Sequence, residues 1–144
     1  MDNQELAERM YRMSVENLRQ IARLSQAVLA QGEDAVLVCL YSWDHPVFAG
    51  EFIDRLGLTT GRIANILKKL EEKRYITRTA DREDRRRVYV SLTDTGRRHA
   101  EKRRQAMVRA CREALDALGP EDALALTRIL GRLCAAPRTR QTGA

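Results

Sequence analysis

The chain has 144 residues, enough for one domain with its own hydrophobic core, and it carries 26 Lys and Arg against 20 Asp and Glu. The resulting net charge of +6 favours a polyanionic partner such as nucleic acid. No apolar run approaches the roughly 20 residues of a membrane span, and the N-terminus lacks the pattern of a signal peptide. We therefore expect a cytoplasmic protein with no membrane partner.

Three widely spaced cysteines, Cys39, Cys111 and Cys134, are odd in number and predict reduced thiols rather than a disulfide framework. Their spacing with histidine does not match a zinc site, so we expect no metal and no cofactor. Each cysteine lies in an apolar helical stretch, where a free thiol behaves as a small hydrophobic group. Cys111, close to Arg109 and Arg112, is the best redox candidate, because cations favour the thiolate.

The positive charge is concentrated in one part of the chain. Residues 1–30 carry four acidic and four basic side chains, whereas residues 68–87 carry nine basic and five acidic ones. We therefore expect the surface that binds a polyanion to lie in the second of these segments.

Apolar periodicity predicts two helices in the first part of the chain. One runs from Glu5 to about Ala30, and a short, largely apolar one runs from about Glu33 to Ser42. The second should be mostly buried, and Asp44 and Pro46 end it because a residue that precedes proline is pushed out of helical geometry.

The next segment predicts two helices joined by a tight turn. Ala49 to Leu56 has apolar residues on one helical face, Gly57 suits its C-terminal turn, and Thr59 suits the N-cap of a helix from Thr60 to about Arg74. Such a pair is a helix-turn-helix unit.

The exposed face of this second helix is rich in donors for DNA. Arg62 and Lys69 can reach guanine O6 and N7, and Asn65 can bond adenine N6 and N7. The alternative is an ordinary solvated helix face, which is the more frequent meaning of such a pattern in a lone helix. Its place in a tight two-helix unit favours DNA contact.

A charged hairpin follows, with strands over Ile76 to Thr79 and Arg87 to Leu92. The segment between them is too polar to be buried, and its arginines could lie along phosphates or in the minor groove. Its acids, Asp81, Glu83 and Asp84, would hold neighbouring arginines in fixed orientations. The alternative is a loop of weak surface ion pairs.

The C-terminal third predicts two more helices. Thr93 suits the N-cap of a long helix from Asp94 to about Leu118, and Pro120 suits the start of the last one. The polar tail, residues 137–144, is expected to be disordered. No arrangement of a nucleophile with a base, paired carboxylates or a phosphate-binding loop is apparent, so we expect no enzyme.

The run LTTGRIANILKKLEEKRYITRTADREDRRRVYVSLTDTG, residues 58–96, resembles the recognition helix, wing and following turn of the MarR family of bacterial transcription regulators. The wing text DREDRR with the alternating strand and SLTDTG is its specific part. The resemblance implies a mainly α fold with a small β wing: a winged helix-turn-helix over residues 31–93, and dimerisation helices over residues 1–30 and 94–136.

The resemblance further implies a homodimer that binds double-stranded DNA at a pseudo-palindromic operator, most often as a repressor. It places Arg86 in the minor groove, oriented by Asp84, with Arg85 and Arg87 on phosphates. The residues implied at the major groove are Thr60, Gly61, Arg62, Asn65 and Lys69.

The chain departs from the family pattern at three positions. Ala64 stands where a hydroxyl residue is frequent, Arg74 where many members have glycine, and Arg87 where a small residue is usual at the wing tip. If position 74 requires a positive φ, arginine is strained there.

Family members commonly release DNA when a small aromatic or phenolic effector binds between the dimer core and the winged domain. Aromatic and histidine side chains near the predicted helix junctions are candidates for such a pocket, although aromatic residues at helix ends usually pack in the protein interior. The candidates are Tyr11, Tyr41, Trp43, His45 and His99.

The leading hypothesis is a dimeric, sequence-specific DNA-binding regulator. The alternative is a winged-helix protein-interaction module that has kept the fold without operator binding, and the acids around the wing and Ala64 are its support.

Overall fold

The computed structural model describes residues 2–28 and 30–135 of the chain, so the predicted disordered tail lies outside the described residues. The described part is mainly helical, with three short strands. In chain order its elements are α1 Asn3–Glu16, α2 Leu18–Val28, α3 Gly32–Trp43, β1 Val47–Phe48, α4 Ala49–Leu56, α5 Thr60–Glu72, β2 Ile76–Ala80, β3 Val88–Leu92, α6 Asp94–Asp116 and α7 Pro120–Ala135.

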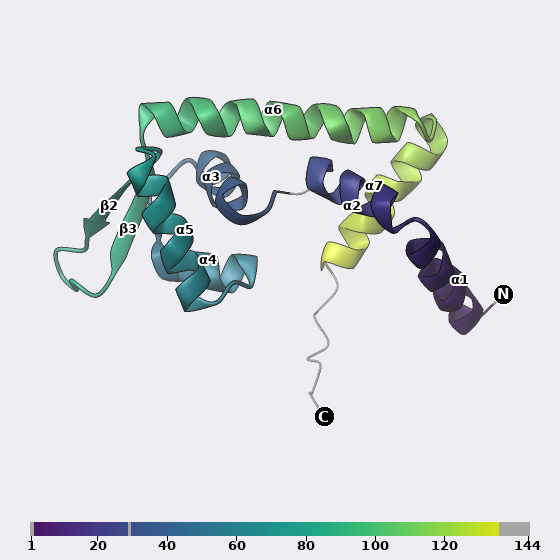
Figure 1. The fold of residues 1–144 in the computed structure, drawn as a ribbon, viewed down its shortest axis with the longest axis horizontal. Coiled ribbons are helices and arrows are strands. Elements are labelled where there is room, and N and C mark those ends of the chain that lie inside the picture. The colour runs from purple at the N-terminus through teal and green to yellow at the C-terminus, as the bar shows by residue number, and fades with distance from the viewer. Residues whose placement is uncertain (1, 29, 136–144) are drawn as a thin grey trace.

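The long helix α6 joins two parts of the molecule (Figure 1). The segment from α3 to β3, here called the winged domain, lies beneath the N-terminal end of α6, and the helices α1, α2 and α7 lie towards its other end (Figure 1). The mainly α architecture with a small β wing confirms the predicted fold class.

The hydrophobic core belongs almost entirely to the winged domain. On α5 the buried residues are Ile63, Ile66, Leu67 and Leu70, at the spacing that puts apolar side chains on one helical face. They pack with buried residues from the surrounding helices and strands, and α6 adds only Ala100. The other core residues are Val36, Leu37, Leu40, Val47, Phe52, Ile76 and Val90.

The small sheet has the strand order β1-β3-β2 and is antiparallel throughout. Strand β1, Val47–Phe48, was not predicted, because two residues before a helix give too short a pattern to recognise. In the observed register Phe48 pairs with Tyr89 of β3, and Tyr89 also pairs with Thr79 of β2. The wing is therefore joined by backbone pairing to the residue that precedes α4.

The prediction of one continuous helix from Glu5 to about Ala30 is wrong. The helix is interrupted at Asn17, which has φ −118° and ψ 26° and lies between α1 and α2. The Asn17 side-chain amide donates to the carbonyl oxygen of Met13 at 2.8 Å, as does its backbone N–H at 3.1 Å. Asparagine side chains compete for backbone partners in this way, which is why they end helices more readily than they continue them.

The junction between the winged domain and α6 is held by backbone and side-chain contacts. Thr93 caps α6 by accepting from Gly96 N at 3.0 Å, as predicted, and its N–H donates to the carbonyl oxygen of Tyr75 at 3.0 Å. Further along α6, Arg103 Nε lies 2.7 Å from Asp34 Oδ2 of α3. The Arg103 contact is a charge pair without the alignment of a hydrogen bond. The first half of α6 is thus fixed to the winged domain.

Candidate nucleic-acid interface

The turn between α4 and α5 has the predicted chemistry. Gly57 has φ 64°, a left-handed conformation that glycine adopts without a Cβ penalty, and its N–H donates to Ile53 O at 3.0 Å. Thr59 Oγ1 accepts from the backbone N–H of Arg62 at 3.3 Å and caps α5. These two local signals fix the direction in which α5 leaves α4.

The predicted reading face of α5 is exposed to solvent, opposite the buried stripe. Arg62, Asn65 and Lys69 form no ion pair and no side-chain hydrogen bond with another described residue. Their donors are therefore available to a partner. Thr60 and Gly61, at the start of the same helix, are also exposed.

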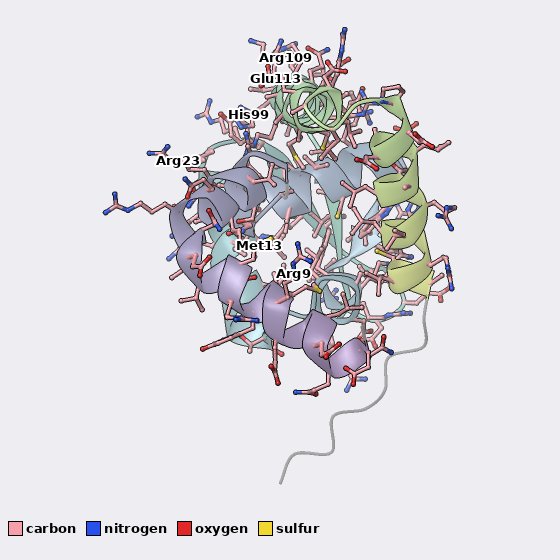
Figure 2. The ribbon with its side chains drawn as sticks, turned by 90° about the vertical axis from the view of Figure 1, so that its right-hand side faces the viewer. Arg9, Met13, Arg23, His99, Arg109 and Glu113 are labelled. Carbon is pink, nitrogen blue, oxygen red and sulfur yellow. The ribbon has the colours of Figure 1, made fainter. Side chains whose placement is uncertain are left out.

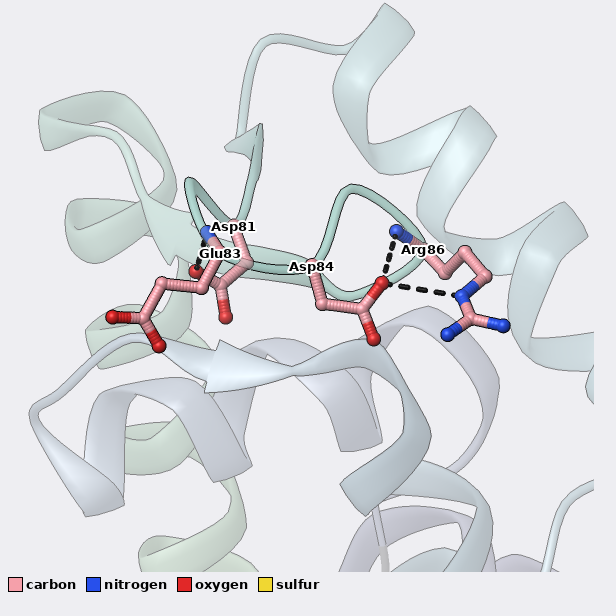
Figure 3. Close-up of polar contacts among 4 residues, drawn as sticks. All are labelled: Asp81, Glu83, Asp84 and Arg86. Carbon is pink, nitrogen blue, oxygen red and sulfur yellow. Dashed lines mark hydrogen bonds and ion pairs between the residues drawn. The ribbon is translucent and has the colours of Figure 1, made fainter.

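In the wing loop, Asp84 holds Arg86, as predicted. Asp84 Oδ1 accepts from the Arg86 backbone N–H at 3.0 Å and from Arg86 Nε at 3.2 Å (Figure 3). The Arg86 side chain nevertheless remains 92% exposed, so its outer two nitrogens are free to bond elsewhere. Asp81 accepts from Glu83 N at 3.1 Å and stiffens the other half of the loop (Figure 3).

Arg87, predicted to meet a phosphate, lies over an aromatic ring in the free protein. Its guanidinium carbon lies 4.0 Å from the centre of the Phe48 ring, and the Phe48 and Tyr89 ring centres are 3.9 Å apart. Arg85, by contrast, has an exposed side chain without a partner among the described residues. Phe48 is a residue that the sequence did not single out, because its contact depends on the pairing of β1 with β3.

The recognition helix ends two residues before the predicted Arg74. α5 stops at Glu72, and Arg74 takes φ 59°, so the conditional expectation of strain at this position is met. The Arg74 carbonyl oxygen accepts from Thr93 Oγ1 at 2.6 Å, which binds the end of α5 to the start of α6.

An ion pair joins α5 to the first wing strand. Arg78 Nε donates to Glu71 Oε2 at 2.9 Å, and this hydrogen bond lowers the pKa of the Glu71 carboxyl and raises the pKa of Arg78. Just after the end of α5, the Lys73 ammonium donates to Glu33 of α3, and this hydrogen bond raises the pKa of Lys73. These two ion pairs neutralise charges at the C-terminal end of α5, away from the reading face. The basic side chains of the reading face remain unpaired within the described part of the chain.

The five candidate effector residues do not meet in one pocket. Trp43 stacks on Phe52 at 5.7 Å between ring centres, and His99 stacks on Tyr75 at 4.6 Å. Tyr11 is 69% exposed on α1.

Of these candidates, His45 borders a hollow between the winged domain and α6. The hollow measures about 110 Å³ and is lined by Leu40, Asp44, His45, Pro46, Ser91, Leu92 and Arg97. Tyr41 is linked to it indirectly, because the Arg97 guanidinium lies 5.8 Å from the centre of the Tyr41 ring.

The cysteines differ in exposure. Cys39 is partly buried against the core, and burial raises the pKa of its thiol, which makes it less reactive. Cys111, the redox candidate, is partly exposed on α6, and no ion pair or hydrogen bond to it is present among the described residues.

Within residues 2–28 and 30–135, no group of three or more His, Cys, Asp or Glu side chains is arranged to hold a metal ion. None of the helices in these ranges is long and apolar enough to cross a membrane.

Comparisons with known proteins agree with this geometry. Residues 44–87 match the sequence model described as MarR family. Over 44 residues the chain is 41% identical to the HTH-type transcriptional regulator SarZ of Staphylococcus epidermidis. That match covers 31% of this chain and 30% of SarZ, so it spans less than a third of the relative's length.

Two solved structures share the fold over most of the chain. A probable transcriptional regulator from Pseudomonas aeruginosa is 27% identical, with a TM-score of 0.67 and coverage of 86% of this chain and 93% of that one. A mutant MarR from E. coli complexed with operator DNA has a TM-score of 0.66 and covers 94% of this chain and 100% of its own, at 18% identity. The second likeness shows the fold alone.

The helix-turn-helix with an exposed basic face and a paired wing defines a winged helix-turn-helix protein. The sequence match to the MarR family covers the turn, the recognition helix and most of the wing, residues 44–87, and the chain is similar to that family over this part. SarZ and the Pseudomonas aeruginosa protein are both described as transcriptional regulators.

Proposed function

We propose that this protein is a homodimeric, sequence-specific DNA-binding transcription regulator, a repressor, that acts on a pseudo-palindromic operator. The observation that carries the proposal is the unpaired donor set on α5 beside a wing arginine oriented by a carboxylate. The proteins named in the comparisons are described as transcription regulators, and one is described as complexed with operator DNA.

The proposed major-groove contacts come from the N-terminal half of α5 and one residue in its next turn. Arg62, Asn65 and Lys69 are exposed and carry the donors that distinguish base edges in the major groove. Thr60 and Gly61 lie at the helix N-terminus, where free backbone N–H groups attract phosphate.

The proposed minor-groove contact is Arg86. Because Asp84 holds the Nε edge of its guanidinium, the outer nitrogens are presented in a fixed direction while staying in solvent. An arginine fixed in this way loses less conformational entropy on binding than a free one. Arg85 is proposed as a phosphate contact.

The homodimer is supported by exposed apolar side chains on the helices outside the winged domain. Neither α1 nor α7 has a buried residue in the single chain. So many exposed apolar side chains are unusual on a soluble monomer and support an interaction surface. The large apolar residues exposed on α1, α2 and α7 are Leu6, Met10, Tyr11, Met13, Val15, Leu18, Ile21, Leu24, Leu124, Leu126, Ile129, Leu130 and Leu133.

The arrangement of these helices suits a second copy of the chain. Figure 2 shows α1 on one side and α7 on the other, with the C-terminal part of α6 above them. The charged Arg109 and Glu113 lie on the outer side of α6 (Figure 2). Apolar residues of a partner could therefore pack between α1 and α7 without burying those two charges.

An effector that releases DNA is the finer part of the proposal. The hollow bordered by His45 lies between the winged domain and α6, where a bound molecule would bear on both. Its volume of about 110 Å³ is below the roughly 300 Å³ at which drug-sized sites begin, so we propose a single-ring aromatic or phenolic compound. Thermal-shift measurements with such compounds on wild type and His45→Ala test this part separately.

Footprinting of the DNA upstream of the protein's own gene tests the main proposal. We expect one protected pseudo-palindromic segment, a dissociation constant below about 1 µM and a steep loss of affinity as salt rises. Equal affinity for that segment and for a scrambled duplex of the same length and composition would contradict sequence-specific binding. Absence of any protected site across the genome would favour the protein-interaction module instead.

A further inference from the structure

Arg87 lies at the junction between the wing-tip loop and strand β3. Its carbonyl oxygen accepts from Asp81 N at 2.8 Å, and its N–H donates to Asp84 O at 2.9 Å. These two backbone bonds close the loop of residues 81–86 on itself. They hold the loop together and do not fix its direction.

The Arg87 side chain supplies a contact that leaves the loop. The guanidinium lies over the Phe48 ring at 4.0 Å, within the distance at which a cation is attracted to the face of an aromatic ring. Phe48 is also in contact with Tyr89, two residues beyond Arg87 on the same strand. The ring of Phe48 is therefore packed by two side chains of the second wing strand.

Phe48 is the last residue before α4, and α4 leads through a tight turn into α5. A contact between Arg87 and Phe48 thus connects the wing tip to the start of the helix-turn-helix. Two open hollows, of about 650 and 600 Å³, both border this pair. The contact between Arg87 and Phe48 therefore lies between two open hollows on the surface of the winged domain.

We propose that Arg87 is a positioning residue, which stacks on Phe48 and fixes the wing tip relative to the recognition helix while Arg85 and Arg86 meet the DNA. The inference rests on the proposed DNA-binding function and changes the role expected of Arg87 from a phosphate contact to a support. The distance between the wing and α5 sets the spacing of minor-groove and major-groove contacts, so this support acts on operator recognition.

The salt dependence of binding separates a support from a phosphate contact. Each phosphate neutralised by a basic side chain contributes about 0.9 to the slope of log affinity against log salt. Removing a phosphate contact lowers that slope, whereas removing a support lowers the affinity and leaves the slope unchanged. Phe48 carries no charge, so a change there tests the support without altering the electrostatics.

The experiment compares Phe48→Leu, Arg87→Gln and the double variant in full-length protein, with the footprinted upstream duplex as probe. We expect each single variant to bind about threefold more weakly at one salt concentration, as the loss of an exposed cation–π contact implies. The double variant should bind no more weakly than either single one, because both remove the same contact. The slope should stay at the wild-type value in all three.

Two matched variants calibrate the measurement. Arg85→Gln removes a proposed phosphate contact and should lower the slope by about 0.9. Arg109→Gln removes the same charge from the outer side of α6, away from the interface, and should change neither affinity nor slope. Melting temperatures equal to wild type show that a weaker affinity does not come from unfolding.

An NMR measurement on the free protein reports the contact without DNA. The side-chain protons of Arg87 should be shifted upfield by the Phe48 ring, and the shift should vanish in Phe48→Leu. Unshifted protons in the wild type, additive effects in the double variant, or a slope lowered by about 0.9 in Arg87→Gln would each overturn the inference while DNA binding itself stands. Failure of the wild-type protein to bind any upstream duplex would overturn the proposed function, and this inference with it.

Discussion

A Cβ atom on Gly96 would lie 1.8 Å from the carbonyl oxygen of Tyr75, so the first turn of α6 rests directly on the backbone that follows the recognition helix. The same oxygen accepts from Thr93 N at 3.0 Å, which holds the two segments at this separation. The obstacle is backbone and cannot rotate away as a side chain would. Position 96 is therefore closed to every residue except glycine unless α6 moves.

We expect Gly96→Ala to destabilise the protein by about 3 kcal/mol, the upper part of the range for overpacking, because α6 or residue 75 must shift. Urea unfolding followed by circular dichroism measures the loss. Gly50→Ala is the matched control, since a Cβ there meets nothing within 4 Å, and it should leave stability the same or slightly higher. Equal stability of Gly96→Ala and wild type would contradict the close packing.

Arg74→Gly is expected to stabilise the protein by about 0.5–1 kcal/mol. Arg74 has φ 59°, where a Cβ costs energy that glycine avoids, and the greater freedom of glycine in the unfolded chain offsets part of the gain. Arg74→Ala keeps the strain and loses the charge, so it should stay within about 0.5 kcal/mol of wild type. A destabilised Arg74→Gly variant would show that the arginine side chain contributes more than its backbone costs.

Arg86→Ala should weaken operator binding about tenfold without changing the melting temperature, since the side chain is exposed and contributes through its outer nitrogens. Asp84→Asn should cause a smaller loss, because an amide oxygen still accepts but does not hold the guanidinium by charge. Fluorescence anisotropy with a labelled operator measures both. Arg109→Ala serves as the control, and a similar loss in that variant would point to net charge rather than a specific contact.

Leu130→Asp should convert the proposed dimer to a monomer, because Leu130 is 50% exposed on the apolar face of α7 and a carboxylate cannot be buried there without a partner. Sedimentation equilibrium measures the mass directly, and we expect the dimer dissociation constant to rise at least about 100-fold. Arg128→Asp alters the charge on the polar side of the same helix and should leave the dimer intact. An unchanged mass for Leu130→Asp would place the interface elsewhere.

Glu71→Gln is expected to destabilise the protein at neutral pH and to have little effect in acid. The hydrogen bond from Arg78 lowers the pKa of the Glu71 carboxyl, so its stabilising contribution is fully present above the unfolded-state pKa of about 4.3 and is lost as the pH falls through the lower folded-state value. Melting temperatures of wild type and variant should therefore converge as the pH drops below about 4. Glu72→Gln, at an exposed neighbour, should show no such convergence.

Local chemistry explains which parts of the structure were predictable. Thr59 and Thr93 cap their helices, and Gly57 takes a left-handed conformation, as their residue types indicate without reference to the rest of the chain. Arg74 was expected to be strained only through the family pattern, and the structure meets that expectation.

The features that the sequence did not predict depend on contacts between distant residues or on a choice between local ones. The strand at Phe48 exists because it pairs with Tyr89, more than 40 positions later, and the Arg87 contact with Phe48 follows from that pairing. The interruption at Asn17 is local: the spacing of the apolar residues favours a continuous helix, whereas the Asn17 side-chain amide bonds the Met13 carbonyl oxygen and ends α1. The five residues proposed to bind an effector lie at separate places in the structure. Which helix ends face each other depends on tertiary packing, which their positions in the sequence do not reveal.

The attachment of α6 at one end gives it the mechanics of a lever arm. Its contacts with the winged domain are concentrated between Thr93 and Arg103, and the remaining turns run on to Asp116 towards the proposed partner. At 1.5 Å per residue its 23 residues extend about 34 Å, so if α6 and the winged domain rotate together by about 10°, the far end of α6 moves by about 6 Å. In the proposed dimer, a displacement of the far end would therefore rotate the reading helix together with α6, and the close approach of Gly96 to Tyr75 leaves no room for the two segments to move independently.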